Sequence, residues 1–334
     1  MDKLRVAFIG AGRHANASLY PSLRLAPIEV VALCALPQDE ETARQTARLF
    51  GVPRVYLHVD DLLRAERDNI DACLVAVQPP DYFELVQRLL VAGLPLFCEK
   101  PAAGSVTQAR ALEDAALRAG IAVQVGFMKR HAAAYRLART RMIASDFGPP
   151  TSFYGKFVVG GGLYPDEYTY LVDNPIHLVD LARYFMGEVA DVKVQRAEWP
   201  GPSWSYAVSL RFESGAVGLL NFATTQSWRQ HNEYAEITGA GRFVTVDNVV
   251  RYRYYPPEGP GEAWEPNFTV PADRNNSLLL MGYAAELAHF AEVARGAAAP
   301  LATLTDARRA LELIDQIYAA GGGVLDPGQT AGAW

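Results

Sequence analysis

The chain has 334 residues, enough for about two domains of ordinary size. Half of the residues are apolar and a fifth are charged, which argues against a disordered chain. The 31 basic and 37 acidic residues give a net charge of −6, so no broad positive field exists to attract nucleic acid.

The sequence also predicts a cytosolic protein with no membrane partner. No basic-then-apolar leader precedes Leu4, and no stretch approaches the roughly 18 consecutive apolar residues that a membrane span needs. Cys34, Cys73 and Cys98 all fall within apolar runs, at an odd count and without paired spacing. This pattern favours reduced thiols in a core over a disulfide framework or a zinc site.

Strands and helices alternate through the first 126 residues. Apolar runs predict strands at 4–10, 28–36, 72–77, 94–98 and 121–126, and helical patterns begin at 14 and cover 40–50, 82–92 and 105–119. Parallel strands need crossover connections, which are normally helical. The sequence therefore predicts an α/β fold that opens with a doubly wound, Rossmann-type parallel sheet, and we place this domain at 1–126.

The second half has a different pattern. A helical stretch at 132–143 is followed by two predicted hairpins, 205–212 with 216–225 and 234–238 with 242–247, and by helices at 282–295 and 305–320. Hairpins require antiparallel pairing. We therefore predict that 127–334 forms an α+β domain with a large, mostly antiparallel sheet.

A glycine motif lies between the first strand and the first helix. Gly10-Ala11-Gly12-Arg13-His14-Ala15 matches G-x-G-x-x-A, in which the glycines allow a tight turn and a close approach of the main chain to a pyrophosphate. The helix N-terminus then faces the diphosphate. Ala35 stands where an NAD site usually has an acidic residue, so the motif predicts a dinucleotide but does not choose between NAD and NADP.

A histidine begins a predicted helix in the second half, within Asp173-Asn174-Pro175-Ile176-His177-Leu178-Val179-Asp180. Asn174 suits the N-cap, Pro175 the first helical position and Gly187 the stop. The positive helix end favours the neutral imidazole, which can take and return a proton. The alternative is that His177 is a core histidine partnered by Asp180.

Further along, Cys98-Glu99-Lys100-Pro101 follows a strand, and Val125-Gly126-Phe127-Met128-Lys129-Arg130 lies at the domain junction. Together with the glycine motif and the His177 helix, these stretches resemble the Gfo/Idh/MocA oxidoreductases over nearly the whole chain. The resemblance implies hydride transfer between NAD or NADP and a carbinol or carbonyl carbon of a sugar, polyol or sugar derivative. It also implies that relatives assemble as dimers or tetramers and that the Lys100–Pro101 bond is often cis.

The resemblance also implies roles for individual residues. Lys100, Asp173 and His177 are the expected catalytic residues, and with Arg130 they are expected to bind substrate. The expected cofactor-binding residues are Gly10, Gly12, Arg13, His14, Gln78, Pro79, Glu99 and Lys100. No metal is expected, because the histidines and cysteines form no ligand-spaced cluster.

The chain departs from the family pattern at Pro175, where glycine is common, and at Tyr82 or Phe83, where a histidine often follows the Gln78 loop. Four aromatic residues, Tyr164, Tyr168, Tyr170 and Trp204, suit either a sugar pocket or a core. Two other functions stay open at this level: nicotinamide-assisted elimination or glycoside cleavage without net redox change, and a catalytically silent dinucleotide sensor.

Overall fold

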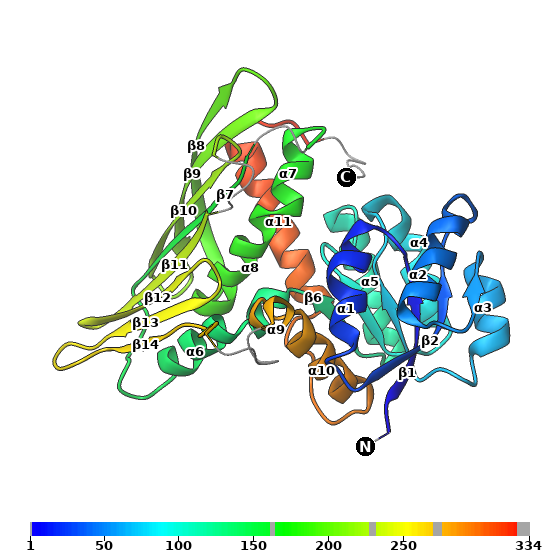
Figure 1. Ribbon diagram of the computed structural model, residues 1–334. Helices are drawn as coiled ribbons and strands as arrows, with labels where there is room; N and C mark the ends of the chain where they lie inside the picture. The colour runs from blue at the N-terminus through cyan, green and yellow to red at the C-terminus, as the bar shows by residue number, and fades with distance from the viewer. Residues whose placement is uncertain (1, 161–163, 227–231, 270–275, 326–334) are drawn as a thin grey trace. The chain divides into compact units, whose positions relative to one another are not determined.

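A computed structural model describes residues 2–160, 164–226, 232–269 and 276–325 (Figure 1). The chain forms two compact units. The first comprises Met1–Met128 and Gly282–Arg308, and the second comprises Lys129–Met281 and Arg309–Trp334. In the described parts of the chain, no helix is both long and apolar enough to cross a membrane.

The first unit is built on a parallel sheet. Its described strands follow the order β3-β2-β1-β4-β5-β6, and every neighbouring pair is parallel. The strands are β1 (Leu4–Ile9), β2 (Ile28–Cys34), β3 (Val55–Tyr56), β4 (Ala72–Val75), β5 (Leu96–Glu99) and β6 (Val123–Gly126). The order reverses between β1 and β4, the place where open α/β sheets bind ligands at their carboxyl edge.

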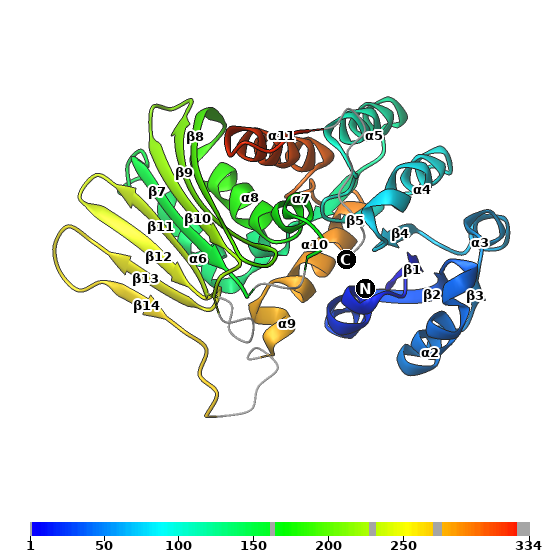
Figure 2. The ribbon, with the colours of Figure 1, turned by 90° about the horizontal axis from the view of Figure 1, so that it is seen from above.

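Helices connect these strands, with α2 on one side of the sheet and α4 and α5 on the other (Figure 2). The helical segments are η1 (Ala15–Leu19), α1 (Tyr20–Leu23), η2 (Pro37–Asp39), α2 (Glu40–Phe50), α3 (Val59–Glu66), α4 (Pro79–Val91), α5 (Val106–Ala119) and α10 (Tyr283–Ala294). Helix α10 contacts α1, β2 and β6. The predicted doubly wound sheet is confirmed.

The second unit is built on a mixed sheet of order β14-β13-β12-β11-β7-β10-β9-β8 among the described residues. Only β7 and β10 pair in parallel within that order; the other pairs are antiparallel. The strands are β7 (Ser152–Val158), β8 (Val189–Trp199), β9 (Ser203–Phe212), β10 (Val217–Ala223), β11 (Asn232–Gly239), β12 (Arg242–Asp247), β13 (Arg251–Tyr255) and β14 (Glu262–Trp264). The predicted mostly antiparallel sheet is confirmed.

Helices of this unit cover one face of the sheet (Figures 1 and 2). They are η3 (Met128–His131), α6 (Ala133–Met142), α7 (Glu167–Asp173), α8 (Pro175–Met186), α9 (Ser277–Leu280) and most of α11 (Leu304–Ala320). Helix α8 packs on β7 and β10. A Cβ on Gly155 of β7 would lie 2.9 Å from a methyl of Leu178, so the missing side chain allows α8 to approach the sheet closely.

From the sequence we expect a single division of the chain at 126/127. The compact units depart from this division in one later segment. Residues 282–308 return to the first unit, because α10 contacts β2 and β6 there. The side chains agree: Gln124 of β6 donates to the carbonyl of Glu286 at 3.0 Å and lies 2.8 Å from Nδ1 of His289. The first unit is therefore made from two separate stretches of chain.

Candidate active site

The glycine turn has the geometry that a dinucleotide requires. Gly10 has φ +118°, and a Cβ there would lie 2.1 Å from the carbonyl oxygen of Ala76. Only glycine fits this backbone, which lies against the end of β4. A Cβ on Gly12, in contrast, would meet nothing within 4 Å. The open space at Gly12 allows a diphosphate to approach the main chain, so the turn fits the cofactor that its sequence predicts.

Hydrogen bonds from the following helix hold this turn in place. Asn16 donates its side-chain amide to the carbonyls of Ala11 at 2.7 Å and Gly12 at 3.1 Å. Thr46 of α2 donates to the side-chain oxygen of Asn16 at 3.0 Å, and Tyr20 donates to the carbonyl of Gly10 at 3.1 Å. The turn is therefore fixed by Asn16 of η1 and Tyr20 of α1, with Thr46 of α2 holding Asn16, before any ligand binds.

Glu99 links the end of β5 to the glycine turn. Its carboxylate is buried, accepts from the backbone N–H of Lys100 at 3.1 Å and lies 3.4 Å from Nε2 of His14. On the other side, a Cβ on Gly126 of β6 would meet this carboxylate at 2.9 Å. Glu99 thus has a tightly defined place between β6 and the turn that carries Arg13 and His14.

The remaining first-unit residues of the predicted site lie at the same edge of the sheet. The Lys100–Pro101 peptide bond is cis, as the resemblance implied, and Lys100 is partly exposed. Gln78 precedes α4, and Pro79 is its first residue. Because β1, β4 and β5 are parallel neighbours, their carboxyl ends place the glycine turn, Gln78 and Lys100 along one edge.

In the second unit, Asp173 and His177 stand at a junction of two helices. Asp173 ends α7, and His177 lies in the first turn of α8 with 8% of its surface exposed. The backbone N–H of His177 donates to the carbonyl of Asn174 at 3.1 Å. Asp166 is the N-cap of helix α7, and its carboxylate accepts from the backbone N–H of Thr169 at 2.8 Å.

The expected cap of α8 is only partly correct. Asn174 occupies the N-cap position and Pro175 the start, but the side chain of Asn174 makes no capping hydrogen bond. Asn174 has helical dihedral angles because it also terminates α7, so its amide instead approaches the Asp173 carboxylate, at 3.4 Å. Gly187 ends the helix with φ +87°, as predicted.

Helix α8 has a buried apolar stripe at helical spacing, and its burial extends further. Leu178, Leu181, Ala182 and Phe185 are each at most 3% exposed. Every residue of α8 except Tyr184 is in fact buried. Burial of each large apolar side chain contributes roughly 1.5–3 kcal/mol, which anchors the helix that carries His177.

Tyr164 is a neighbour of Asp173 that sequence reasoning grouped only with other aromatic residues. Its hydroxyl forms a hydrogen bond with the Asp173 carboxylate, and burial followed by the charge of Asp173 raises the pKa of this phenol. The ring lies 5.3 Å from that of Tyr170, which stacks on Trp204 at 6.2 Å. These rings form a buried aromatic cluster beside Asp173 rather than an open surface.

Arg130 also has a defined partner. Its guanidinium donates to both carboxylate oxygens of Asp180, at 2.9 and 2.5 Å, and both side chains are at most 5% exposed. The neighbouring Lys129 pairs with Glu233 of β11, which also accepts from the hydroxyl of Tyr135 at 2.6 Å. Sequence reasoning missed Glu233, because no local pattern connects it to a residue about 100 positions earlier.

The three cysteines are free and buried, as predicted. Burial raises the pKa of the Cys34 and Cys73 thiols to about 12, so both stay protonated at neutral pH. Within the described residues, no group of three or more histidine, cysteine or carboxylate side chains is arranged to hold a metal ion.

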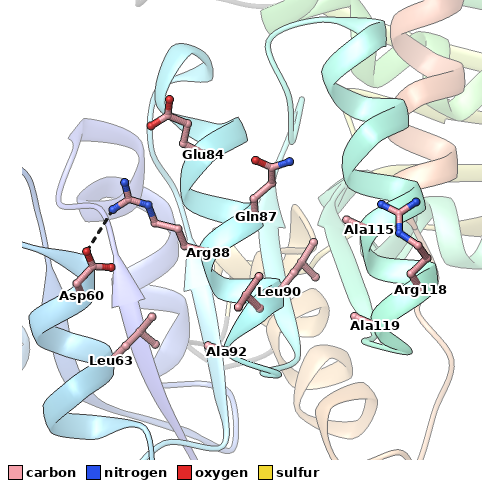
Figure 3. A pocket seen from close by; sticks show the side chains of 11 residues that line it. Asp60, Leu63, Glu84, Gln87, Arg88, Leu90, Ala92, Ala115, Arg118 and Ala119 are labelled. Atoms are coloured by element: carbon pink, nitrogen blue, oxygen red, sulfur yellow. Dashed lines mark ion pairs between the residues drawn. The ribbon is translucent and has the colours of Figure 1, made fainter.

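A surface pocket lies elsewhere in the first unit, between α3, α4 and α5 (Figure 3). Arg88 of α4 reaches Asp60 of α3 at 3.5 Å along its wall, and Arg118 of α5 lies on the opposite side. None of the predicted catalytic or cofactor-binding residues lines it. This pocket is therefore separate from the candidate active site.

A parallel sheet with a glycine turn at its switch point, joined to a second unit with a large mixed sheet, defines a dinucleotide-binding oxidoreductase architecture. Residues 4–127 match the oxidoreductase family with an NAD-binding Rossmann fold, and residues 169–321 match the C-terminal alpha/beta domain of the same family. The chain belongs to the Gfo/Idh/MocA family of oxidoreductases.

The sequence identity of the chain to individual members of known function or structure is low. The chain is 26% identical over 330 residues to the scyllo-inositol 2-dehydrogenase (NAD(+)) of Bacillus subtilis, covering 93% of this chain and 92% of that protein. It is 31% identical over 196 residues to the D-apiose dehydrogenase of Paraburkholderia graminis, covering 57% and 51%. The crystal structure of a dehydrogenase from Chromobacterium violaceum has the same fold, with a TM-score of 0.86, 23% identity and 96% coverage of both chains.

Proposed function

We propose that this oxidoreductase transfers a hydride between a nicotinamide dinucleotide, NAD or NADP, and a carbinol or carbonyl carbon of a sugar, polyol or sugar derivative. The observation that carries the proposal is the meeting of the glycine turn with Glu99 and Lys100 at one edge of the parallel sheet, in a chain of this family. Similarity to an inositol dehydrogenase and an apiose dehydrogenase supports the substrate class.

The first unit would hold the cofactor. Gly10 and Gly12 would admit the diphosphate, and the N–H groups of Arg13 and His14 follow at the helix start. Gln78, Pro79 and Glu99 would border the nicotinamide end of the site. The cofactor, when bound, supplies the acceptor or donor of the hydride.

His177, Lys100 and Asp173 would handle the substrate oxygen. In the oxidative direction, His177 would take the hydroxyl proton and the carbinol carbon would release its hydride to the nicotinamide, so that a carbonyl would form. The ammonium of Lys100 stabilises the negative charge that develops on this oxygen. Asp173, held by Tyr164, would bind a neighbouring substrate hydroxyl and orient the imidazole.

The test has two stages. Fluorescence titration with NADH and NADPH identifies the preferred cofactor, and a panel of polyols, aldoses and ketosugars is then assayed for absorbance change at the nicotinamide band. We expect tight binding of one dinucleotide and stoichiometric turnover with at least one polyol or sugar. Tight binding without turnover across the panel would favour a sensor, and product formation without net cofactor change would favour transient oxidation.

We also propose a homodimer or homotetramer assembled through the second unit. The sheet face opposite α8 exposes Tyr154, Val217 and Leu219, with 37%, 55% and 45% of their surfaces accessible. Leu219 of β10 pairs in register with Tyr154 of β7, and Tyr154 contacts Tyr234 of β11, so the apolar groups form one continuous patch. A patch of this kind is typical of an association surface.

We also propose a cytosolic location, which the free buried thiols support.

A further inference from the structure

Two consecutive basic residues in η3 are buried and reach different partners. Lys129 pairs with Glu233 of β11, and its ammonium lies 4.3 Å from the ring centre of Phe157 on β7. Arg130 instead pairs with Asp180 of α8. The short η3 segment is therefore fixed to the sheet by one side chain and to helix α8 by the next.

The Arg130–Asp180 contact constrains the geometry more strongly than a single hydrogen bond does. Two N–H groups of the planar guanidinium reach the two carboxylate oxygens, at 2.9 and 2.5 Å, so both distance and orientation are set. The guanidinium also lies 4.9 Å from the ring centre of Tyr184, one turn further along α8. The pair thus holds two successive turns of this helix.

Asp180 follows His177 by three residues, so the two side chains lie on the same side of α8, one turn apart. The segment that carries Arg130 directly follows β6, where Gly126 pairs with Glu99, the residue before Lys100. If α8 slid along its axis or turned about it at Asp180, the proposed proton acceptor, His177, would therefore move relative to this segment.

We infer that Arg130 and Asp180 are positioning residues for His177: their bidentate pair sets the place of the imidazole by fixing α8 to the segment that leaves β6. This role replaces direct substrate binding for Arg130, which is only 4% exposed as a residue and whose guanidinium already pairs with Asp180. The inference rests on the proposed function, because it assigns a purpose to the exact placement of a proton-transfer group. A displacement of about 1 Å in such a group can reduce a rate on the order of 100-fold.

The first test needs no substrate. In a proton–carbon correlation NMR spectrum of the histidine Cε1–H groups, the six histidines give six expected signals, and the signal of His177 is assigned from its loss in His177→Gln. Arg130→Lys keeps the charge but loses the planar fork. We expect Arg130→Lys and Asp180→Asn to shift the His177 signal by more than its linewidth. An unmoved signal in both variants would overturn the inference.

The matched control lies at the other end of the same helix. Arg183 donates to both carboxylate oxygens of Glu188, at 3.1 and 2.6 Å. This second bidentate pair lies in the last turn of α8, whereas His177 lies in the first. Arg183→Lys should leave the His177 signal within its linewidth. An equal shift in this control would show that α8 responds generally to a lost pair, which also contradicts the inference.

A double variant separates positioning from stability. Replacing a buried ion pair by apolar residues of similar volume is often neutral for folding, whereas removing one partner leaves an uncompensated buried charge. Arg130→Met with Asp180→Leu should therefore melt close to the wild-type temperature while the His177 signal stays displaced. A return of that signal to its wild-type position would mean that the ion pair does not set the imidazole.

Kinetics provide the second readout once a substrate is known. Arg130→Lys should lower kcat about 10- to 100-fold, with KM and the Kd for NADH changed by no more than about twofold. A raised KM at unchanged kcat would instead identify Arg130 as a substrate ligand and overturn the inference. If the wild-type protein transfers no hydride at all, the proposed function fails, and the NMR comparison still decides the positioning role.

Discussion

At the scale of single residues, the two glycines of the dinucleotide turn have different physical reasons for being glycine. Gly10 needs a positive φ and the absence of a Cβ, because Ala76 occupies the space. Gly12 has neither requirement in the protein alone, since a Cβ there would be unobstructed. The fold alone therefore gives no reason for glycine at this position, and we propose that Gly12 serves the approach of the dinucleotide.

This difference predicts opposite behaviour of two alanine variants. Gly10→Ala should lower the free energy of unfolding by about 2–4 kcal/mol, from the strained backbone and the clash with Ala76. Gly12→Ala should leave unfolding unchanged without ligand and weaken NADH binding about 10-fold or more, a loss of about 1.4 kcal/mol or more. Denaturant unfolding and fluorescence titration measure the two effects. Equal destabilisation by both variants would contradict this account.

At the scale of elements, the contact between β7 and α8 connects the sheet to the histidine helix. Gly155 leaves room for Leu178, and a Cβ added there would stand 2.8 Å from the Phe153 ring and 2.9 Å from a Leu178 methyl. Because α8 is buried on almost all sides, it has little freedom to move away from an added methyl group. Overpacking of this kind is destabilising even though it adds apolar atoms.

The two residues should therefore be coupled. Gly155→Ala should cost about 1–3 kcal/mol from overpacking, and Leu178→Ala about 2–5 kcal/mol from the cavity it leaves. The double variant should cost less than the sum of the two, because the new methyl group occupies part of the vacated space. Chemical denaturation of all four proteins gives the coupling energy. Strict additivity would show that the helix is free to shift.

The sequence predicts most elements of the first unit because each strand there is a short apolar run followed by a clear helix signal. Helix α5, for example, begins after Ser105, whose hydroxyl accepts from the backbone N–H of Gln108, and ends at Gly120 with φ +65°. Strand β3 has only two residues and gives no such signal. Strand β8 has only partly buried and exposed residues, so it lacks the apolar run that predicts a strand from the sequence.

The candidate site was predictable where chemistry is local in sequence and not where it depends on packing. The Gly10 turn and the His177 helix start follow local rules for turns and caps. The partners of Arg130 and Lys129 lie 50 and 104 residues away, and nothing local indicates them. Tyr164 is close to Asp173 in the sequence, but its hydrogen bond to that carboxylate depends on how its ring packs, which no local sequence pattern indicates.

At the scale of the whole molecule, the chain returns to its first unit late. Helix α10 contacts α1, β2 and β6, and it follows the large sheet in the sequence. The first unit extends to Arg308, so it cannot be finished until 308 residues are made. Local sequence patterns predicted this helix but not that it packs in the first unit. Within the second unit, the described helices lie on one face of the large sheet in Figures 1 and 2, and the opposite face exposes Tyr154, Val217 and Leu219.

A charge placed on this face should disrupt assembly. Leu219→Lys puts an ammonium at the centre of the patch and should shift the protein to a smaller species in sedimentation velocity. Leu117→Lys, at a residue 73% exposed on α5 of the first unit, is the matched control and should leave the sedimentation coefficient unchanged. A monomeric wild-type protein, or an unchanged Leu219→Lys variant, would contradict the proposed interface.

The proposed mechanism requires Lys100 and His177 to act on one substrate oxygen. A double-mutant cycle on the single-turnover rate of hydride transfer tests this requirement directly. Lys100→Met and His177→Ala should each slow transfer about 100-fold or more with NADH affinity nearly unchanged, and the double variant should be little slower than the slower single variant. Rates that stay at the wild-type value, or two losses that multiply fully in the double variant, would contradict a shared role.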